Sequence, residues 1–171
     1  ILFILFFIFF SLNGSAQCLS TNNLTTFYAS NNGQAGQQFD IVALVDIEIC
    51  LMDVNLYAGT HNYQISTKAG THVGFEGTPA AWTLIGGPIA ITSNGVDVAT
   101  PIPIPINLTI LAGNTGAIYF TCDRTLSTGG NRYTNGTGVG NLLANNADMQ
   151  ILEGTGKAWN FGTNYRPRSF N

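Results

Sequence analysis

The sequence predicts an all-β fold, a two-sheet antiparallel β-sandwich of jelly-roll type. Three observations lead to this prediction. No long window places apolar residues three and four positions apart, as an amphipathic helix requires. Several short segments instead alternate apolar with polar residues, which is the pattern of a half-buried strand. The chain has 20 glycines, and turn dipeptides such as Asn32-Gly33 and Asn135-Gly136 separate these segments.

The N-terminal residues 1–10 are all apolar, and smaller and more polar residues follow them. This pattern is typical of a secretory signal peptide, and Gly14 and Ala16 supply the small side chains that precede a cleavage site. We expect a signal peptide over residues 1–16 with cleavage before Gln17. We also expect this signal peptide to lack its first residues, because neither Met nor a basic residue precedes the apolar run.

The apolar N-terminal run has two alternative interpretations, a membrane anchor and a lipoprotein signal. A membrane anchor needs about 20 apolar residues, and this run is shorter. Lipid attachment at Cys18 needs a small residue before the cysteine, where Gln17 stands. The expected location is therefore secreted or cell-surface, with no membrane span after signal cleavage.

The remaining residues, 17–171, fit a single β-sandwich domain. Charged residues make up 9% of the chain and the net charge is -3. A nucleic-acid-binding protein carries a basic patch, which this composition does not supply. Nucleic acid is therefore not an expected partner.

The clearest strand signal covers residues 39–56, where Val45, Ile47 and Ile49 alternate with polar residues. The alternation changes phase near Leu51-Met52, which predicts a bulge or bend that passes the chain to a new direction or sheet. Further strands are expected at 24–29, 63–68, 82–85, 89–92, 102–110, 117–122, 150–152 and 157–161. The residues expected to face the core are Val45, Ile47, Ile49, Ile106, Leu108 and Ile110.

Prolines alternate with isoleucines over residues 101–106. In an extended chain Pro101, Pro103 and Pro105 remove every amide donor from the same edge, so no strand can pair there. We interpret this as a protected sheet edge, and the alternative is a proline-rich ligand for another protein.

Three cysteines, Cys18, Cys50 and Cys122, enter an oxidising compartment, which allows one disulfide and leaves one thiol. The sequence does not decide the pairing. No Cys/His cluster has the spacing of a zinc site, so no metal and no cofactor are expected.

No catalytic motif is present, and the sequence predicts no enzyme activity. His61 and His72 are expected to be exposed loop residues. Glu76 and Glu153 would make a glycosidase pair only if the fold brought them together, which gives the alternative of a secreted glycosidase-like hydrolase.

Two stretches, one with Asp53 and Asn55 and one with Asp148, could supply oxygen ligands for calcium. Neither stretch has the density of carboxylates of a calcium loop, and turn capping is the preferred interpretation.

Aromatic residues provide the main functional signal, because sugars stack on exposed rings. Trp82 lies in an apolar run and is expected in the core. The other candidates lie in segments rich in Asn, Gly and Thr, which are typical of loops. The candidate ligand site consists of Tyr133, Asn135, Trp159, Tyr165 and Arg166.

Several stretches in order make the chain resemble a recurring β-sandwich module of secreted multidomain proteins from Bacteroidota, many of which carry a C-terminal sorting domain. These stretches are 32–34, 39–41, 47–56, 71–74, 82–86, 133–136, 150–154, 156–157, 161–162 and 166–168. The resemblance implies an accessory or adhesive repeat with no established catalytic residues. It also implies that the chain stops inside its last strand. Cys50 and Cys122 depart from the pattern of the module.

The function expected from the sequence is that of a non-catalytic secreted or cell-surface accessory module for adhesion, glycan binding or domain spacing. The alternatives are the hydrolase and a purely structural repeat. The expected partners are glycans or other surface proteins, and other domains of a longer polypeptide.

Overall fold

The computed structural model describes residues 22–171, and this part of the chain is all-β. Its one helical element is a short 3-10 helix, Pro79–Ala81. The all-β prediction is therefore confirmed for the described residues. The expected signal peptide over 1–16, the cleavage site at Gln17 and the residue Cys18 lie outside them.

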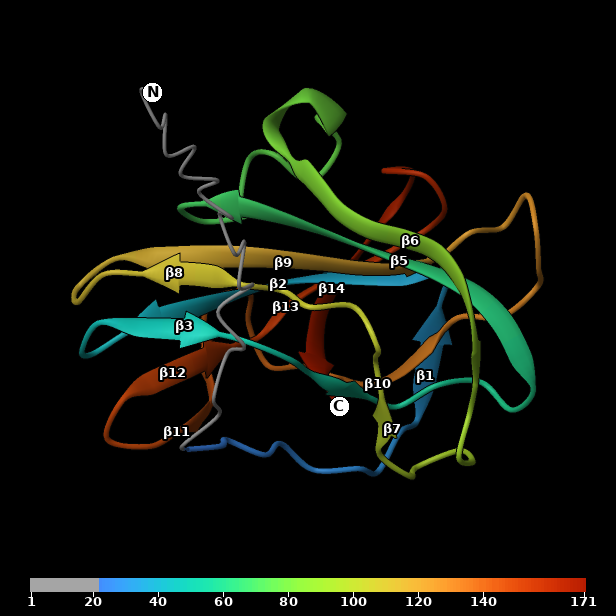
Figure 1. Cartoon of the computed structure of the whole chain (residues 1–171), viewed down its shortest axis with the longest axis horizontal. Coiled ribbons are helices and arrows are strands. Elements are labelled where there is room, and N and C mark those ends of the chain that lie inside the picture. The colour runs from blue at the N-terminus through green and yellow to red at the C-terminus, as the bar shows by residue number, and fades with distance from the viewer. Residues whose placement is uncertain (1–21) are drawn as a thin grey trace, which may run out of the picture.

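Ten strands form one large antiparallel sheet (Figure 1). Along the sheet the order is β1-β10-β14-β13-β2-β9-β5-β6, and β12 also pairs with β2 and with β11. The strands are β1 Asn32–Gln34, β2 Gly36–Ala43, β5 Thr60–Ala69, β6 Thr83–Thr92, β9 Thr115–Cys122, β10 Asn131–Asn135, β11 Leu142–Asn145, β12 Met149–Leu152, β13 Gly154–Lys157 and β14 Asn164–Phe170.

Four short strands form two further pairs. Strand β3, Ile47–Ile49, pairs with β8, Leu108–Ile110. Strand β4, Asp53–Val54, pairs with β7, Thr100–Pro101. The chain thus changes sheet between β3 and β4, as the phase change near Leu51-Met52 predicted. The structure shows one large sheet and two small ones.

The core lies on one face of the large sheet, here called the core face. Phe39 and Ile41 of β2 and Ile118 and Phe120 of β9 point to it. Buried side chains from the short strands and their flanking segments pack against these residues, namely Val54, Leu56, Ile102, Ile104, Ile106 and Ile110. Each such side chain contributes about 2 kcal/mol when it leaves water.

Five of the six residues predicted to face the core do so. Ile106 and Ile110 are buried, and Ile47, Ile49 and Leu108 are half-buried against the same cluster. The prediction is wrong for Val45, which is 46% exposed. It lies in the connection between β2 and β3, where the strand alternation does not apply.

In the proline-isoleucine stretch, exposed prolines alternate with buried isoleucines, as expected for an extended chain. Ile102 and Ile106 are buried, and their amides donate to the carbonyls of Met52 (3.1 Å) and Cys50 (2.9 Å). The intervening prolines at 101, 103 and 105 are exposed. Because successive residues of an extended chain point to opposite sides, the proline nitrogens face away from the segment 50–52.

Several strand predictions need correction. Residues 24–29 are not a strand, and β13 ends at Lys157 instead of beginning there. Segments 82–85 and 89–92 belong to one strand, β6. Strands β10 and β14 were not expected, because their sequences lack a regular apolar alternation.

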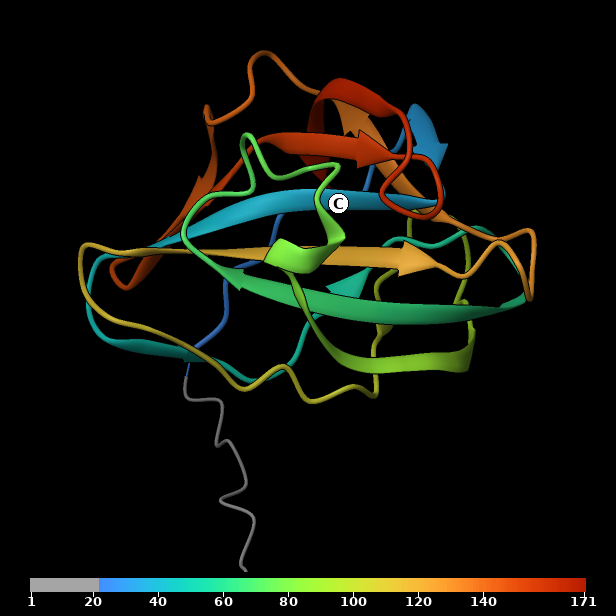
Figure 2. The same ribbon diagram turned by 90° about the horizontal axis from the view of Figure 1, so that it is seen from above.

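The opposite face of the large sheet is here called the outer face. The segment 70–82, which connects β5 to β6, crosses it, as the view from above shows (Figure 2). Trp82 ends this segment and is buried, with its ring 5.9 Å from that of Tyr119 and 6.2 Å from that of Phe161. Trp82 is therefore a packing residue, as predicted.

Candidate functional site

The segment 70–82 is held on the outer face by hydrogen bonds at several points. The Gly70 amide donates to the Thr115 carbonyl at 2.8 Å. The Gln38 side chain donates to the Glu76 carbonyl at 3.2 Å, and the indole of Trp82 donates to the Phe75 carbonyl at 3.0 Å. These bonds fix the backbone over strands β2 and β9.

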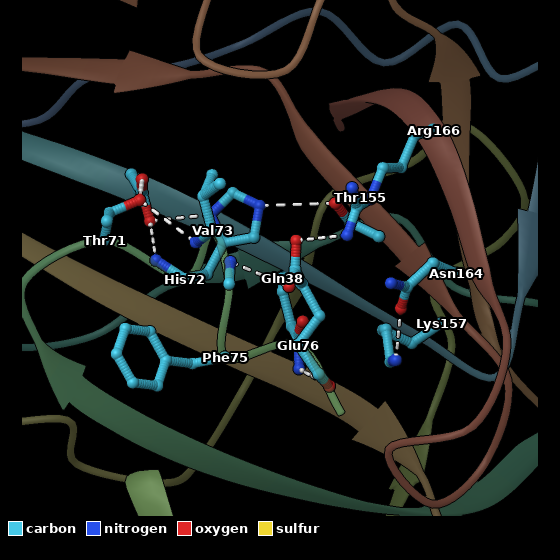
Figure 3. A network of polar contacts seen from close by, with 12 residues as sticks. Gln38, Thr71, His72, Val73, Phe75, Glu76, Thr155, Lys157, Asn164 and Arg166 are labelled. Atoms are coloured by element: carbon cyan, nitrogen blue, oxygen red, sulfur yellow. Dashed lines mark hydrogen bonds and ion pairs between the residues drawn. The ribbon is translucent and has the colours of Figure 1, made fainter. Parts of the chain in front are cut away.

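A buried polar network lies beneath this segment (Figure 3). Asp40 is on β2, and its Oδ1 lies 2.7 Å from Nδ1 of His72. The His72 amide and the Thr71 hydroxyl also donate to this carboxylate, at 2.8 and 2.5 Å. On the other side of the ring, Nε2 of His72 lies 3.3 Å from the hydroxyl of Thr155 on β13.

The Asp40 carboxylate is stabilised in its ionised form. Burial opposes ionisation, but the hydrogen bonds from His72 and Thr71 outweigh it and lower the pKa of Asp40. An ionised carboxylate only accepts hydrogen bonds, so Nδ1 of His72 carries a proton and donates it to Asp40.

The prediction that His72 is an exposed loop residue is wrong, because its side chain is fully buried. Its partner Asp40 points to the outer face from β2. The two residues are 32 positions apart in the sequence, so no local pattern indicates the pair. His61 lies at the start of β5 and is half-buried, with Nε2 3.1 Å from the Ala58 carbonyl.

The order acid, histidine, hydroxyl is that of a nucleophilic triad. A triad acts only when its hydroxyl can reach a substrate carbonyl. The side chains of Asp40, His72 and Thr155 are all buried, where the segment 70–82 meets the sheet. In this arrangement the three residues bind the segment to the sheet and present no hydroxyl to solvent.

An ion pair extends the network toward the surface. Arg166 of β14 donates to Oε1 of Glu76, while the Gly74 amide donates to Oε2 at 2.9 Å. Glu76 is buried, and the Arg166 side chain is 44% exposed. The pair therefore links β14 to the segment 70–82 at its solvent edge.

Lys157, the last residue of β13, is fully buried. Its ammonium donates to the Gly162 carbonyl and to Oδ1 of Asn164, each at 2.5 Å. Burial lowers the pKa of Lys157 to about 8, against the opposing effect of Glu76 and with a further lowering by Arg166.

Glu76 and Glu153 are held by separate sets of hydrogen-bond donors. Glu153 accepts from the amides of Thr137 (2.6 Å) and Gly138 (2.8 Å), and among residues 22–171 it shares no hydrogen-bond donor with Glu76. Burial raises the pKa of Glu153, but these bonds outweigh it and lower the pKa overall. A general acid requires a shift in the opposite direction.

The residues predicted to bind a ligand do not share one surface. Tyr133 is not in a loop: it lies on β10 and is fully buried on the core face, opposite Phe170. Asn135 is exposed and accepts from the Asn32 side chain at 3.1 Å. The Tyr133 ring cannot stack on a sugar in this position.

The other three candidates lie around β14. Tyr165 pairs with Gly156 and is half-buried, and Arg166, the next residue, points to the outer face toward Glu76. Successive strand residues point to opposite faces, so Tyr165 and Arg166 are separated by the sheet. Trp159 is half-buried in the β13–β14 connection.

One exposed aromatic residue on the outer face was not predicted. Phe75 is 41% exposed, and the ammonium of Lys68 lies 4.1 Å from its ring centroid. Val73, two residues earlier, is also exposed. The signal that could have identified Phe75 is its position in a turn segment, between Gly74 and Gly77.

A cavity of about 700 Å³ lies on the other side of the sheet, between residues 22–28 and strand β3. Core-face side chains such as Phe39, Ile118 and Phe170 line it. A catalytic pocket combines a cavity with titratable groups whose pKa values are shifted. The Asp40–His72 pair does not line this cavity, so the pair and the cavity do not form one site.

Two of the three candidate calcium ligands, Asn55 and Asp148, have protein partners. The Asn55 side chain donates to Asp97 at 2.8 Å, and Asp148 accepts from the Asn22 side chain at 2.7 Å. Within residues 22–171, no cluster of three His, Cys, Asp or Glu side chains has a metal-binding arrangement. Cys122 is a free, buried thiol.

No helix in the described part of the chain has the length and apolar character that a membrane crossing requires. In comparisons with known proteins, no family model matches the chain, and no curated protein sequence is significantly similar to it. The function must therefore be inferred from the residues and their geometry.

Proposed function

We propose that the protein is a non-catalytic, secreted or cell-surface accessory module that binds glycans or other surface proteins in adhesion, or spaces the domains of a longer polypeptide. The observation that supports this most is the Asp40–His72–Thr155 network. Its polar groups are buried and hold the segment 70–82 on the outer face. The network serves to fix a surface segment.

The fixed segment supplies the proposed binding surface. Val73 and Phe75 are exposed on it, and Lys68 and Arg166 flank it with cationic donors. A sugar presents an apolar face to an aromatic ring and hydroxyls to donors of this kind. A segment that is already ordered also loses less entropy on binding. Trp159 is kept as a candidate because its side chain is partly exposed, whereas Tyr133 is buried.

We also propose that the short pairs β3–β8 and β4–β7 act as the second layer of a jelly-roll-like sandwich. Their side chains pack in the same core cluster as those of the large sheet, which supports a two-layer arrangement. This architecture agrees with the module of secreted Bacteroidota proteins that the sequence resembles.

The test is a glycan array, followed by titration of the exported domain with the polysaccharides that it retains. One shallow site gives weak affinity, so a multivalent form of the domain is used on the array. The test variant combines Phe75→Ala with Trp159→Ala, and it is expected to weaken binding at least tenfold. Phe27→Ala is the matched control, because Phe27 has a similar exposed fraction (45%).

Four results are informative. A loss of binding in the test variant alone supports the proposed surface. Equal binding by the test and control variants places the site elsewhere, and no binding to any glycan favours domain spacing or a purely structural repeat. Release of reducing ends from a polysaccharide would contradict the non-catalytic proposal and favour the hydrolase.

A further inference from the structure

Lys157 and Asn164 face each other across the β13–β14 pair. They are register partners on adjacent antiparallel strands, so their backbones hold the two side chains together. The amine of Lys157 donates to Oδ1 of Asn164 at 2.5 Å, a contact drawn in Figure 3. Oδ1 is bonded to Cγ, so the amine lies next to the carboxamide carbon.

The burial of Lys157 increases the fraction of neutral amine above that of an ordinary lysine. The side chain is fully buried, and its two hydrogen-bond acceptors, the Gly162 carbonyl and the Asn164 carboxamide, are both uncharged. Burial lowers the pKa of the amine to about 8. At pH 7 about a tenth of the molecules then carry a neutral amine, whereas an ordinary lysine has fewer than about one in a thousand. A neutral amine is a nucleophile, and an ammonium is not.

We propose that Lys157 and Asn164 form an intramolecular isopeptide bond. Nζ of Lys157 attacks Cγ of Asn164, and the bond from Cγ to Nδ2 breaks. A proton passes from Nζ to the departing nitrogen, which leaves as ammonia. The product is an amide between the two side chains, and the exchange needs no oxidant, metal or cofactor.

The fold supplies what this reaction needs. Side chains that are held in contact react as though their concentration were very high, because the entropy of bringing them together is already lost. The Gly162 carbonyl holds the amine beside Asn164. Asn164 itself is exposed at the start of β14, which leaves ammonia a path to solvent. The bond would close the connection 158–163 covalently, including Trp159.

The first test uses the natural sequence, without substitutions, and its two lysines, Lys68 and Lys157. The purified exported protein is denatured and treated with an amine-acetylating reagent, and its lysines are located by peptide mass spectrometry. We expect Lys68 to be acetylated and Lys157 not. A non-tryptic digest should also contain a branched peptide that joins Lys157 to Asn164 and is one ammonia lighter than its two parts.

Peptide mapping is needed because ammonia can be lost elsewhere. An N-terminal Gln17 loses ammonia when it cyclises, and Asn-Gly pairs such as Asn32-Gly33 lose it when they form succinimides. Neither change joins two peptides or blocks a lysine. The branched peptide therefore distinguishes the proposed bond from both.

The second test uses variants. Lys157→Arg and Asn164→Ala are each expected to abolish the branched peptide, and Lys68→Arg is expected to leave it unchanged. Circular dichroism shows whether each variant is folded. If Lys157 is acetylated as completely as Lys68 in the denatured natural chain, and no branched peptide is found, the bond does not exist and Lys157 is a buried hydrogen-bonding residue only.

Discussion

Nδ1 of His72 lies 2.7 Å from Oδ1 of Asp40, and both side chains are buried. The contact joins the segment 70–82 to the middle of β2. Removing one partner leaves the other buried without its hydrogen bond, which costs more than the bond itself contributes. The variants of this pair are therefore the most direct test of the network.

His72→Leu keeps most of the side-chain volume but removes both ring nitrogens. We expect a loss of about 3 kcal/mol in the free energy of unfolding, because Asp40 and Thr155 both lose a partner. Urea denaturation followed by circular dichroism measures it. His61→Leu is the control, since His61 is half-buried with one contact to the Ala58 carbonyl, and a change below about 1 kcal/mol is expected. Equal losses in the two variants would contradict the special role of His72.

The second prediction concerns acid stability. The hydrogen bonds to Asp40 lower its pKa below the ordinary value of 3.8, so the folded state holds this proton less tightly than the unfolded state does. The resulting stabilisation is complete above the unfolded pKa and is lost as the pH falls through the folded pKa. We expect the urea midpoint to fall steeply below about pH 4.

Asp40→Asn tests the source of this acid sensitivity. The variant should be less stable at neutral pH, and its stability should fall less steeply below about pH 4. Some slope will remain, because the pKa of Glu153 is also lowered. An unchanged pH profile in Asp40→Asn would show that Asp40 does not contribute to the acid dependence.

The sequence predicted strands marked by apolar alternation or by a short apolar run, such as β5 and β9, and the change of sheet near Leu51-Met52. It did not predict β10 and β14. These strands carry polar residues such as Asn131, Arg166 and Arg168 at buried or half-buried positions or in ion pairs, so hydrophobic alternation is absent. The alternation rule detects burial by apolar contact only.

The candidate site depended on contacts between distant residues, which no local pattern encodes. Asp40 and His72 are 32 positions apart, and His72 and Thr155 are 83 positions apart. Tyr133 was misplaced because Asn and Gly follow it and suggested a loop, although the strand continues to Asn135. Most of the apolar core residues could be assigned from period, with Val45 as an exception, whereas the polar contacts required the topology.

The third prediction concerns the proline edge. Pro103→Thr with Pro105→Thr restores two amide donors on the side that faces away from the segment 50–52. The side chains at these positions are exposed, so we expect little change in the unfolding midpoint. We expect instead that the variant self-associates as its concentration rises, because an open edge can pair with another chain. Light scattering after size-exclusion chromatography measures this.

The control for this experiment is Pro79→Thr, which also restores a donor but lies in the 3-10 helix and not at a sheet edge. It should elute as the natural protein does. If the double variant remains as monomeric as the control at every concentration, the prolines do not protect the edge.

The last prediction concerns the approach of β13 to β2. A Cβ atom added at Gly154 would lie 1.9 Å from the carbonyl oxygen of Gln38, which belongs to the backbone of β2 and cannot move without breaking the sheet. We expect Gly154→Ala to lower the free energy of unfolding by at least about 3 kcal/mol. Gly77→Ala is the control, because the nearest atom to its added Cβ is 3.8 Å away. Urea denaturation of both variants should give a large loss for Gly154→Ala and a change within about 0.5 kcal/mol for Gly77→Ala. Because Thr155 follows Gly154 and binds His72, Gly154→Ala should also increase amide exchange in the segment 70–82, and an unchanged exchange pattern there would show that the segment does not depend on the position of β13.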